Sequence, residues 1–185
     1  QAFEHRAIND VAVLAMAQDA AGPLVLSSVG DLMRLSGEGL DGLAQADAMH
    51  TGAGRLFLSD EAGGFACIDG GVAWLLKGAP VTAAAAVEGD DGFVAVARWS
   101  GAQGHLDLVE TDGNGLVTHE VAKIEAMVGE GQRLAVGTNE GDIIVLDAPM
   151  LRRRMAQDEG EAETVDEDAV AHRAAMLAKL QALRS

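Results

Sequence analysis

A period of about 40 residues, recurring between residues 9 and 149, is the feature that most limits what this chain can fold into. Each period contains short apolar runs that are separated by Gly, Asn or Asp. Such runs predict short antiparallel strands joined by tight turns. The second runs are LVLSS from Leu24, LFLSD from Leu56, VAVAR from Val94 and LAVGT from Leu134. The third runs are DLMRLS from Asp31, GFACID from Gly64, HLDLVE from His105 and DIIVLD from Asp142.

The remaining runs complete a unit of four strands. A first run precedes each pair, as VAVLAMA, ADAMHT, VTAAAAVE and KIEAMV, and a fourth run is clear twice, at residues 72–77 and 115–121. Four short strands in about 40 residues is the spacing of a β-propeller blade. One such sheet cannot bury both of its faces alone, so blades must stack around an axis. We therefore expect an all-β propeller or partial propeller of about four blades, with a C-terminal helix.

The last unit resembles a blade of the WD-repeat family. GDIIVLD stands where that family carries Gly-x-Ile-x-Val-Trp-Asp, with Leu146 in place of the Trp, and the preceding LAVGTNEG resembles the family's second strand and turn. In the other units only Asp69 keeps the terminal Asp, and no unit begins with Gly-His. The family's structural Asp–His–Ser/Thr–Trp network is therefore not expected. The resemblance implies a propeller but no particular activity, because that fold hosts both scaffolds and enzymes.

The sequence does not determine how the ring is closed. The last unit has no obvious fourth strand after Asp147, because Pro149 and three arginines follow. The N-terminal segment AFEHRAI could supply that strand and close a ring of four blades. Otherwise a missing segment, a partner chain or a second copy would complete a larger ring. A β-sandwich or a stack of hairpins with a helical tail is the alternative to any propeller.

The character of the chain changes after Pro149, and we expect three parts. Residues 1–149 form the propeller-like domain, 150–163 a charged linker and 164–185 an amphipathic helix. Thr164 and Glu167 match a capping box, in which each side chain bonds the backbone N–H of the other. The helix would present one apolar face to a partner. That predicted partner-binding face consists of Val165, Ala169, Met176, Leu177, Leu180 and Leu183.

Charge and cysteine content exclude several classes of protein. The net charge is −16, and residues 1–149 carry 22 acidic against 7 basic residues. Such a body repels nucleic-acid phosphates and anionic membranes, so neither is an expected partner. The single cysteine, Cys67, excludes a disulfide framework and is expected to be a small buried hydrophobe. No signal peptide is recognisable and no apolar run approaches about 20 residues, so we expect a cytoplasmic protein.

Two segments imitate ligand-binding loops. ETDGNGLVTHEV, residues 110–121, resembles a calcium loop, but its first position is Glu110 and its last is Val121, with the closing acid one place early at Glu120. Its flanks alternate like strands, so a hairpin turn is expected there. Residues 37–42 match GxGxxG, yet a Glu and an Asp lie where a pyrophosphate would bind. We interpret this segment as a blade-connecting loop.

No catalytic, cofactor-binding or metal-ligating residue is assigned. The five histidines show no metal-motif spacing, although His105 and His119 could be neighbours in a hairpin. Ser59 and Asp60 with His50 nearby are interpreted as a turn, and Trp74 and Trp99 as core residues. The leading hypothesis is a non-enzymatic scaffold that binds a protein partner or a second copy and needs no cofactor. The alternative is a ligand-binding or enzymatic propeller with a metal or small molecule in its channel.

Truncation at Gln157 tests the role of the predicted tail helix. If the helix is a docking element, the shortened chain keeps the melting temperature of the full chain but loses its partner. A marked drop in the melting temperature on truncation would instead mean that the helix packs on its own propeller. Differential scanning calorimetry and a binding assay on both chains measure the two quantities.

Overall fold

The computed structural model describes residues 12–19, 22–35, 38–43, 45–69, 71–90 and 92–154. The chain divides into two compact units, Gln1–Ala148 and Pro149–Ser185. All strands found in the described residues belong to the first unit. The expected all-β class is therefore confirmed.

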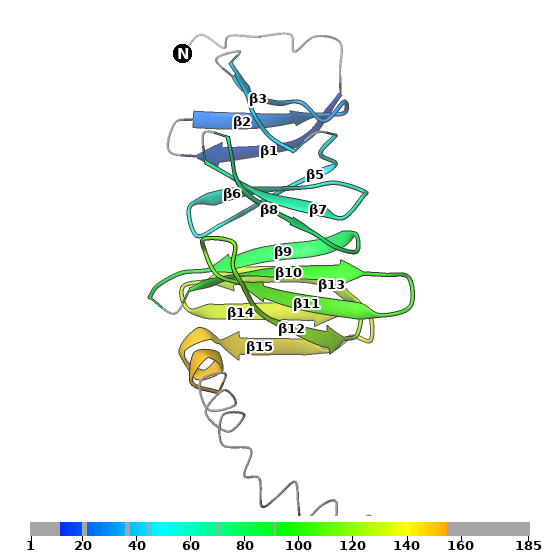
Figure 1. Cartoon of the computed structure of the whole chain (residues 1–185), viewed down its shortest axis with the longest axis vertical. Helices are drawn as coiled ribbons and strands as arrows, with labels where there is room; N and C mark the ends of the chain where they lie inside the picture. The colour runs from blue at the N-terminus through cyan, green and yellow to red at the C-terminus, as the bar shows by residue number, and fades with distance from the viewer. Residues whose placement is uncertain are drawn as a thin grey trace, which may run out of the picture. The chain divides into compact units, whose positions relative to one another are not determined.

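The described strands form four antiparallel sheets, here called blades 1 to 4, in which neighbouring strands follow chain order (Figure 1). Blade 1 contains β1 (Val13–Asp19), β2 (Gly22–Ser27), β3 (Leu32–Arg34) and β4 (Gly39–Leu40). Blade 2 contains β5 (Ala48–Gly52), β6 (Arg55–Ser59), β7 (Gly64–Ile68) and β8 (Val72–Lys77). Blade 3 contains β9 (Val81–Val87), β10 (Phe93–Trp99), β11 (Gly104–Val109) and β12 (Gly115–Val121). Blade 4 contains β13 (Ile124–Glu130), β14 (Arg133–Thr138) and β15 (Ile143–Asp147).

The apolar runs of the sequence correspond to strands in every blade. The first, second and third runs are the first, second and third strands, and the two clear fourth runs are β8 and β12. The glycine-rich segment 37–42, expected to be a connecting loop, contributes a short strand instead. Residues 39–40 pair with β3 as β4.

One turn is repeated in three blades, and it shows which residues of these blades are equivalent. Glycine N–H groups at 30, 63 and 141 donate to the carbonyl oxygens of Ser27, Asp60 and Thr138 at 3.0, 3.1 and 3.1 Å. These glycines have φ between 87 and 89°, a region that favours glycine. The side-chain oxygens of Ser27, Asp60 and Thr138 each accept the N–H four residues on. Ser27 is thus the equivalent of Asp60, so aligning LVLSS directly with LFLSD was wrong by one residue.

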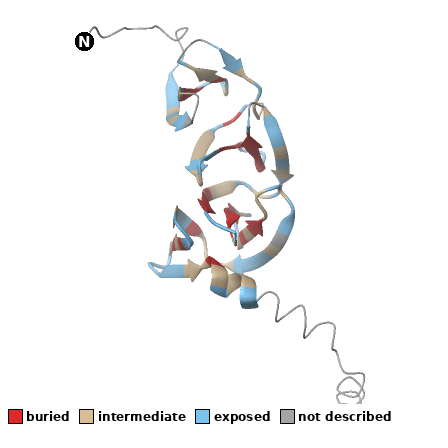
Figure 2. Cartoon of the chain, turned by 90° about the vertical axis from the view of Figure 1, so that its left-hand side faces the viewer, coloured by how far each residue is buried: buried red, intermediate tan, exposed pale blue. Residues whose placement is uncertain are grey.

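Successive blades pack face to face. Among the described strands, substantial contacts between neighbouring blades join β1 to β5, β5 to β9 and β9 to β13, and no comparable contact joins blade 1 to blade 4. In Figure 2 the buried segments lie inside the row of sheets, while pale blue is common on the outer strands. The cluster between blades 1 and 2 comprises Leu24, Leu26, Leu32, Ala46, Leu56, Leu58, Ala66 and Ile68. The cluster between blades 2 and 3 comprises Phe57, Phe65, Cys67, Ala86, Val94, Val96 and Val109.

A buried arginine joins blade 3 to blade 2. Arg98, only 4% exposed, bonds Asp107 on the next strand through Nε at 2.8 Å. Its Nη1 donates to the carbonyl oxygens of Gly63 at 2.8 Å and Ala79 at 2.7 Å. Gly63 lies in the repeated turn of blade 2, so one side chain bonds acceptors on both blades.

The turn between β11 and β12 is also attached to blade 2. Arg55 and Trp74 both donate to the carbonyl oxygen of Thr111, Trp74 through Nε1 at 3.2 Å. A Cβ on Gly113 would lie 2.7 Å from the Trp74 ring, so only glycine allows this approach. The junction between blades 2 and 3 therefore combines hydrogen bonds with close packing.

Blade 4 approaches blade 3 through backbone as well as side chains. A Cβ on Gly129 would lie 2.0 Å from the carbonyl oxygen of Ala86, so β13 and β9 are in direct backbone contact there. The N–H of Glu88 donates to the carbonyl oxygen of Gly131 at 2.8 Å. Leu134 and Val136 are buried on the same side of blade 4.

Residues 148–154 form a short helix, which differs from the expected linker beginning at residue 150. Proline is tolerated in the first turn of a helix, and the following MLRRR has good helix propensity. Arg153 Nε donates to the carbonyl oxygen of Pro149 at 3.3 Å. No helix in the part of the chain that the structure describes has the length and apolar character needed to cross a membrane.

Replacement of Arg98 by Met should destabilise the first unit by about 3 kcal/mol. The change removes the charged partner of the Asp107 carboxylate and the Arg98 donor to the carbonyl oxygens of Gly63 and Ala79. Asp107 still accepts from the Thr118 hydroxyl and is partly open to water, and Gly63 still accepts from the Gly78 N–H, which limits the loss. Urea unfolding measures the free energy. Arg133→Met, on the exposed start of β14, is the control and should change stability by about 0.5 kcal/mol or less. Equal losses in both variants would contradict the role given to Arg98.

Candidate protein-interaction surface

Blade 4 has an apolar face that no other described part of the chain covers. The registers place Val128, Ala135 and Val145 in one row across its three strands, and Ala126, Gly137 and Ile143 in the next. Successive side chains in a strand alternate between faces, and the opposite face carries the buried Leu134 and Val136. These six residues thus point away from blade 3. They are called the open face of blade 4: Ala126, Val128, Ala135, Gly137, Ile143 and Val145.

The exposed fractions on this face are large. Val128 is 62% exposed, Ile143 79% and Val145 62%. A Cβ on Gly137 would meet only the carbonyl oxygen of Ala126, at 3.9 Å, whereas Gly129 on the other face has no room at all. The next row along the face pairs Glu130, Arg133 and Asp147. An apolar centre bordered by charges has the layout of a protein interface.

The same positions are buried in the preceding blades. The repeated turn and the strand registers make Ile143 equivalent to Phe65 in blade 2 and Leu32 in blade 1. Phe65 is 0% and Leu32 3% exposed, because the following blade covers each of them. Val145 is likewise equivalent to Cys67, which is buried. The open face of blade 4 is therefore a blade-junction surface without its neighbouring blade.

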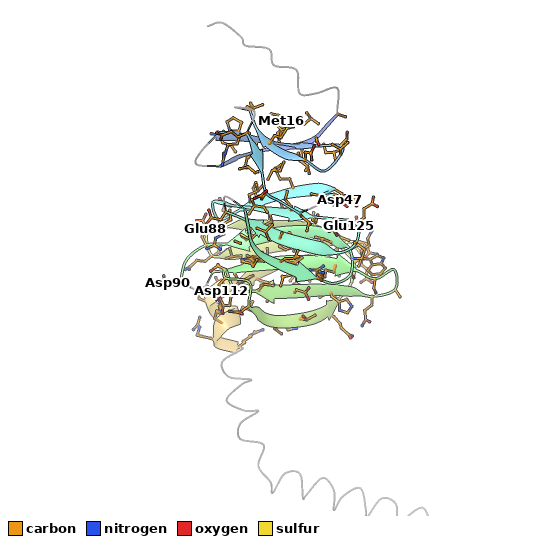
Figure 3. All side chains as sticks on the ribbon, turned by 45° about the horizontal axis from the view of Figure 1, so that its top comes forward. Met16, Asp47, Glu88, Asp90, Asp112 and Glu125 are labelled. Atoms are coloured by element: carbon orange, nitrogen blue, oxygen red, sulfur yellow. The ribbon has the colours of Figure 1, made fainter. Side chains whose placement is uncertain are left out.

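Blade 1 shows the converse surface at the other end of the row. Met16 pairs with Val25, as Met49 pairs with Leu58 and Met127 with Val136. Met49 packs against the cluster between blades 1 and 2, and Met127 is half-buried on the blade 3 side. Met16 is 65% exposed (Figure 3), since no described blade precedes it. Met16 is the exposed residue of this face, here called the open face of blade 1, whereas Val25, its partner in the same row, is 1% exposed.

The third strand of blade 4 also has an exposed edge. No fourth strand pairs with β15 among the described residues, and four of its five residues are apolar, whereas β7 and β11 are paired with β8 and β12. β7 is buried along its whole length, whereas Ile143–Val145 of β15 are exposed. The sequence predicted that the last blade has no fourth strand after Asp147, and this is confirmed for the described residues. The N-terminal segment AFEHRAI, one of the candidates for supplying that strand, lies outside the described residues.

The calcium-like loop is a hairpin turn, as expected. The N–H of Glu110 donates to the carbonyl oxygen of Asn114 at 2.7 Å, and Gly113 has φ of 95°. Asn114 donates to the Asp112 carboxylate through both its backbone N–H at 3.0 Å and its side-chain amide at 2.8 Å. The carboxylate is thus used within the turn.

The two histidines of this hairpin lie on opposite faces of the sheet. His105 pairs with Glu120, and His119 pairs with Leu106. Adjacent pairs alternate in direction, so the two imidazoles cannot share a ligand. Within the described ranges no group of three or more His, Cys, Asp and Glu residues could hold a metal ion.

One polar cluster was not recognised in the sequence. His50 Nε2 lies 3.1 Å from Ser59 Oγ, and Ser59 donates to the Asp47 carboxylate at 3.3 Å. Ser59 is 2% exposed, so its hydroxyl is not available to a substrate. Burial lowers the pKa of His50, against a smaller raising effect of Asp47. The signal available in the sequence was the placement of Asp47, His50 and Ser59 at or beside two adjacent strands, but no motif marks it.

Cys67 and Trp74 belong to the core or pack against it as expected, whereas Trp99 belongs to neither hydrophobic cluster. Cys67 is buried in the junction between blades 2 and 3, and burial raises the pKa of its thiol. Trp74 contacts Phe57 and Phe65 with ring centroids 6.0 and 6.1 Å apart. Trp99 is half-buried at the end of β10. The predicted partner-binding face of the tail lies beyond residue 154, outside the described residues: Val165, Ala169, Met176, Leu177, Leu180 and Leu183.

Comparison with known proteins gives the fold alone. No family model matches the chain, and no curated protein matches its sequence. Hsv2p of Kluyveromyces lactis is similar in structure, with a TM-score of 0.56 and 17% identity, over 75% of this chain and 50% of that one. Raptor of Chaetomium thermophilum gives 0.56 and 13%, over 74% and 16%. The computationally designed Ika4 protein gives 0.55 and 14%, over 75% and 92%.

These similarities, together with the four sheets, define the class of the molecule. The chain has a β-propeller fold, and its similarity to WD-repeat-type propellers is structural. It spans half the length of Hsv2p and 16% of the length of Raptor. At these identities the shared fold carries no activity or partner over to this chain.

Acidification should destabilise the protein partly through His50. Its pKa is lower in the folded chain than the usual value of about 6.5. As the pH falls through that value the unfolded chain binds the proton first, so stability declines until the pH passes below the folded pKa. His50→Gln keeps a polar group beside Ser59 but does not titrate. Urea unfolding of both proteins between about pH 7.5 and 5.5 should show a shallower loss in His50→Gln, and parallel losses would contradict the assignment.

Proposed function

We propose that this chain is a non-enzymatic protein–protein interaction scaffold built on a β-propeller. The observation that carries the proposal is the open face of blade 4, where Val128, Ile143 and Val145 are each more than 60% exposed. Contiguous exposed apolar surface of this kind marks protein-binding sites on soluble domains. The residues equivalent to Ile143 and Val145 in blade 2 are buried against the next blade, so an apolar protein surface is a suitable partner for this face.

The other face of blade 4 is closely packed against blade 3. Leu134 and Val136 anchor the sheet from behind, and Gly129 lies directly against the backbone of β9. A preorganised face loses little conformational entropy when a partner covers it. The exposed edge of β15 adds backbone groups that an extended segment of a partner can pair with.

The tail is a second docking element in this proposal. It rests on the apolar pattern of residues 164–185 and on the capping box that begins them. The scaffold therefore has two surfaces, one on the propeller and one on the tail. A protein partner or another copy of the chain is the occupant that both surfaces favour.

An enzymatic or ligand-binding propeller would require convergent carboxylates or histidines at one end of a channel. In the ranges described above, His105 and His119 diverge and Asp112 is held within its own turn. Ser59 is buried beneath His50 and Asp47. These arrangements favour the scaffold over an enzyme.

Photocrosslinking in an extract of the source cells tests this function. Benzoylphenylalanine in place of Val145 should give a covalent adduct to protein after irradiation, because the open face of blade 4 is occupied there. The same residue in place of Val72, which is 45% exposed on the outer strand β8, is the matched control. Mass spectrometry identifies the adduct.

An adduct at position 145 to any protein, including a second copy, supports the scaffold. Adduct formation no greater at position 145 than at position 72 would contradict it. Both substituted chains should keep the far-ultraviolet circular dichroism of the native chain, since both positions are exposed.

A further inference from the structure

We propose that the partner on the open face of blade 4 is the open face of blade 1 of a second copy, so that two chains close one ring of eight blades. This inference rests on the proposed function, because it names the occupant of the same surface. It replaces closure within one chain by closure between two. The argument uses the junctions already present inside the chain as the pattern for the missing ones.

The two open faces are the two halves of one kind of junction. Between blades 1 and 2, Met49 and the pair Ala15 and Ala17 pack on the same cluster from opposite blades. Met16 is the equivalent of Met49, and Ala126 and Val128 are the equivalents of Ala15 and Ala17. Met16 of one copy therefore meets Ala126 and Val128 of the other in a junction of the same geometry.

Side-chain size is also complementary, with the large and the small face exchanged relative to the junction between blades 2 and 3. Between blades 2 and 3, the large Phe57 and Phe65 face the small Ala84 and Ala86. On the open face of blade 4 the centre is small, with Ala126, Ala135 and Gly137, and the open face of blade 1 offers the long Met16. Large against small allows two sheets to pack without cavities.

Two copies leave no junction surface uncovered. Each chain has one open face of each kind, so a twofold pair forms two identical junctions and closes. Eight blades lie within the range of about 4 to 8 that propellers adopt. Closure within one chain would need contact between blades 1 and 4, and the described strands make no substantial contact of that kind.

Charge gives the assembly a characteristic dependence on salt. Each chain carries a net charge of −16, so two copies repel each other outside the apolar junctions. Added salt screens that repulsion and should strengthen the pairing. A partner bound through opposite charge would show weaker binding as salt is added.

Light scattering after gel filtration of the full chain measures the assembly. The wild-type chain of 19.1 kDa should elute with twice that mass, and the dimer should dissociate less at higher salt. Met16→Glu and Val128→Lys, made in separate chains, should each give monomers, because each buries an unpaired charge in both junctions. Val72→Lys, on β8 away from both faces, should remain dimeric.

A mixture of the Met16→Glu and Val128→Lys chains provides the decisive arm. In the mixed pair one junction is native, and the other places the introduced carboxylate of one copy beside the introduced ammonium group of the other. The doubled mass should therefore return. Circular dichroism confirms that each variant is folded, as expected for side chains that are more than 60% exposed.

A wild-type chain that stays monomeric at every concentration, or a dimer that persists in Val128→Lys, would overturn the two-copy ring. So would a mixture that remains monomeric. None of these outcomes bears on the crosslink at Val145, which would then identify a different protein on the same face. Failure of the two-copy ring and failure of the scaffold function are thus distinguishable.

Discussion

Each blade is a sheet with two apolar faces, and burial of both faces is the constraint on which the body depends. Blades 2 and 3 satisfy it completely, because each has a neighbour on either side. Only 3% of the residues are aromatic, so the junctions are built largely from Ala, Val and Leu. Small side chains allow close approach, and Ala86 on β9 lies between Gly52 of blade 2 and Gly129 of blade 4. Blades 1 and 4 satisfy the constraint on one face each.

The strands were predictable because their signal is local. Each apolar run ends at a residue that turns the chain, and the repeat at about 40 residues reinforces the assignment. The register of blade 1 was not predictable from the run alone, since LVLSS looks like LFLSD but Pro23 occupies the place of Leu56. Hydrogen bonds of the turn, with Ser27 in the role of Asp60, decide the alignment. The role of Arg98 was hidden for the same reason, because its acceptors lie 19 and 35 residues away.

The sequence predicted only that blade 4 lacks a fourth strand, and it did not predict the exposed apolar face. The sequence showed that DIIVLD lacks a following strand, but it could not show that Ile143 and Val145 occupy positions that are buried elsewhere. That conclusion needs the pairing of β14 with β15 and of β6 with β7. The histidines illustrate the opposite case. Proximity along the hairpin allowed His105 and His119 to be neighbours, and the alternation of the strands then separates them onto two faces.

The attachment of Arg55 and Trp74 to the carbonyl oxygen of Thr111 makes the body mechanically uneven. Blades 2 and 3 share that attachment, the Arg98 bonds and the apolar cluster at their junction, so they should open together as one cooperative unit. Blades 1 and 4 are each held along a single side. In a linear array of repeats the ends fray first, since a terminal unit gives up only one interface on opening. Amide exchange and proteolytic cleavage would therefore begin at the ends, and whatever covers those ends also determines how long the chain survives.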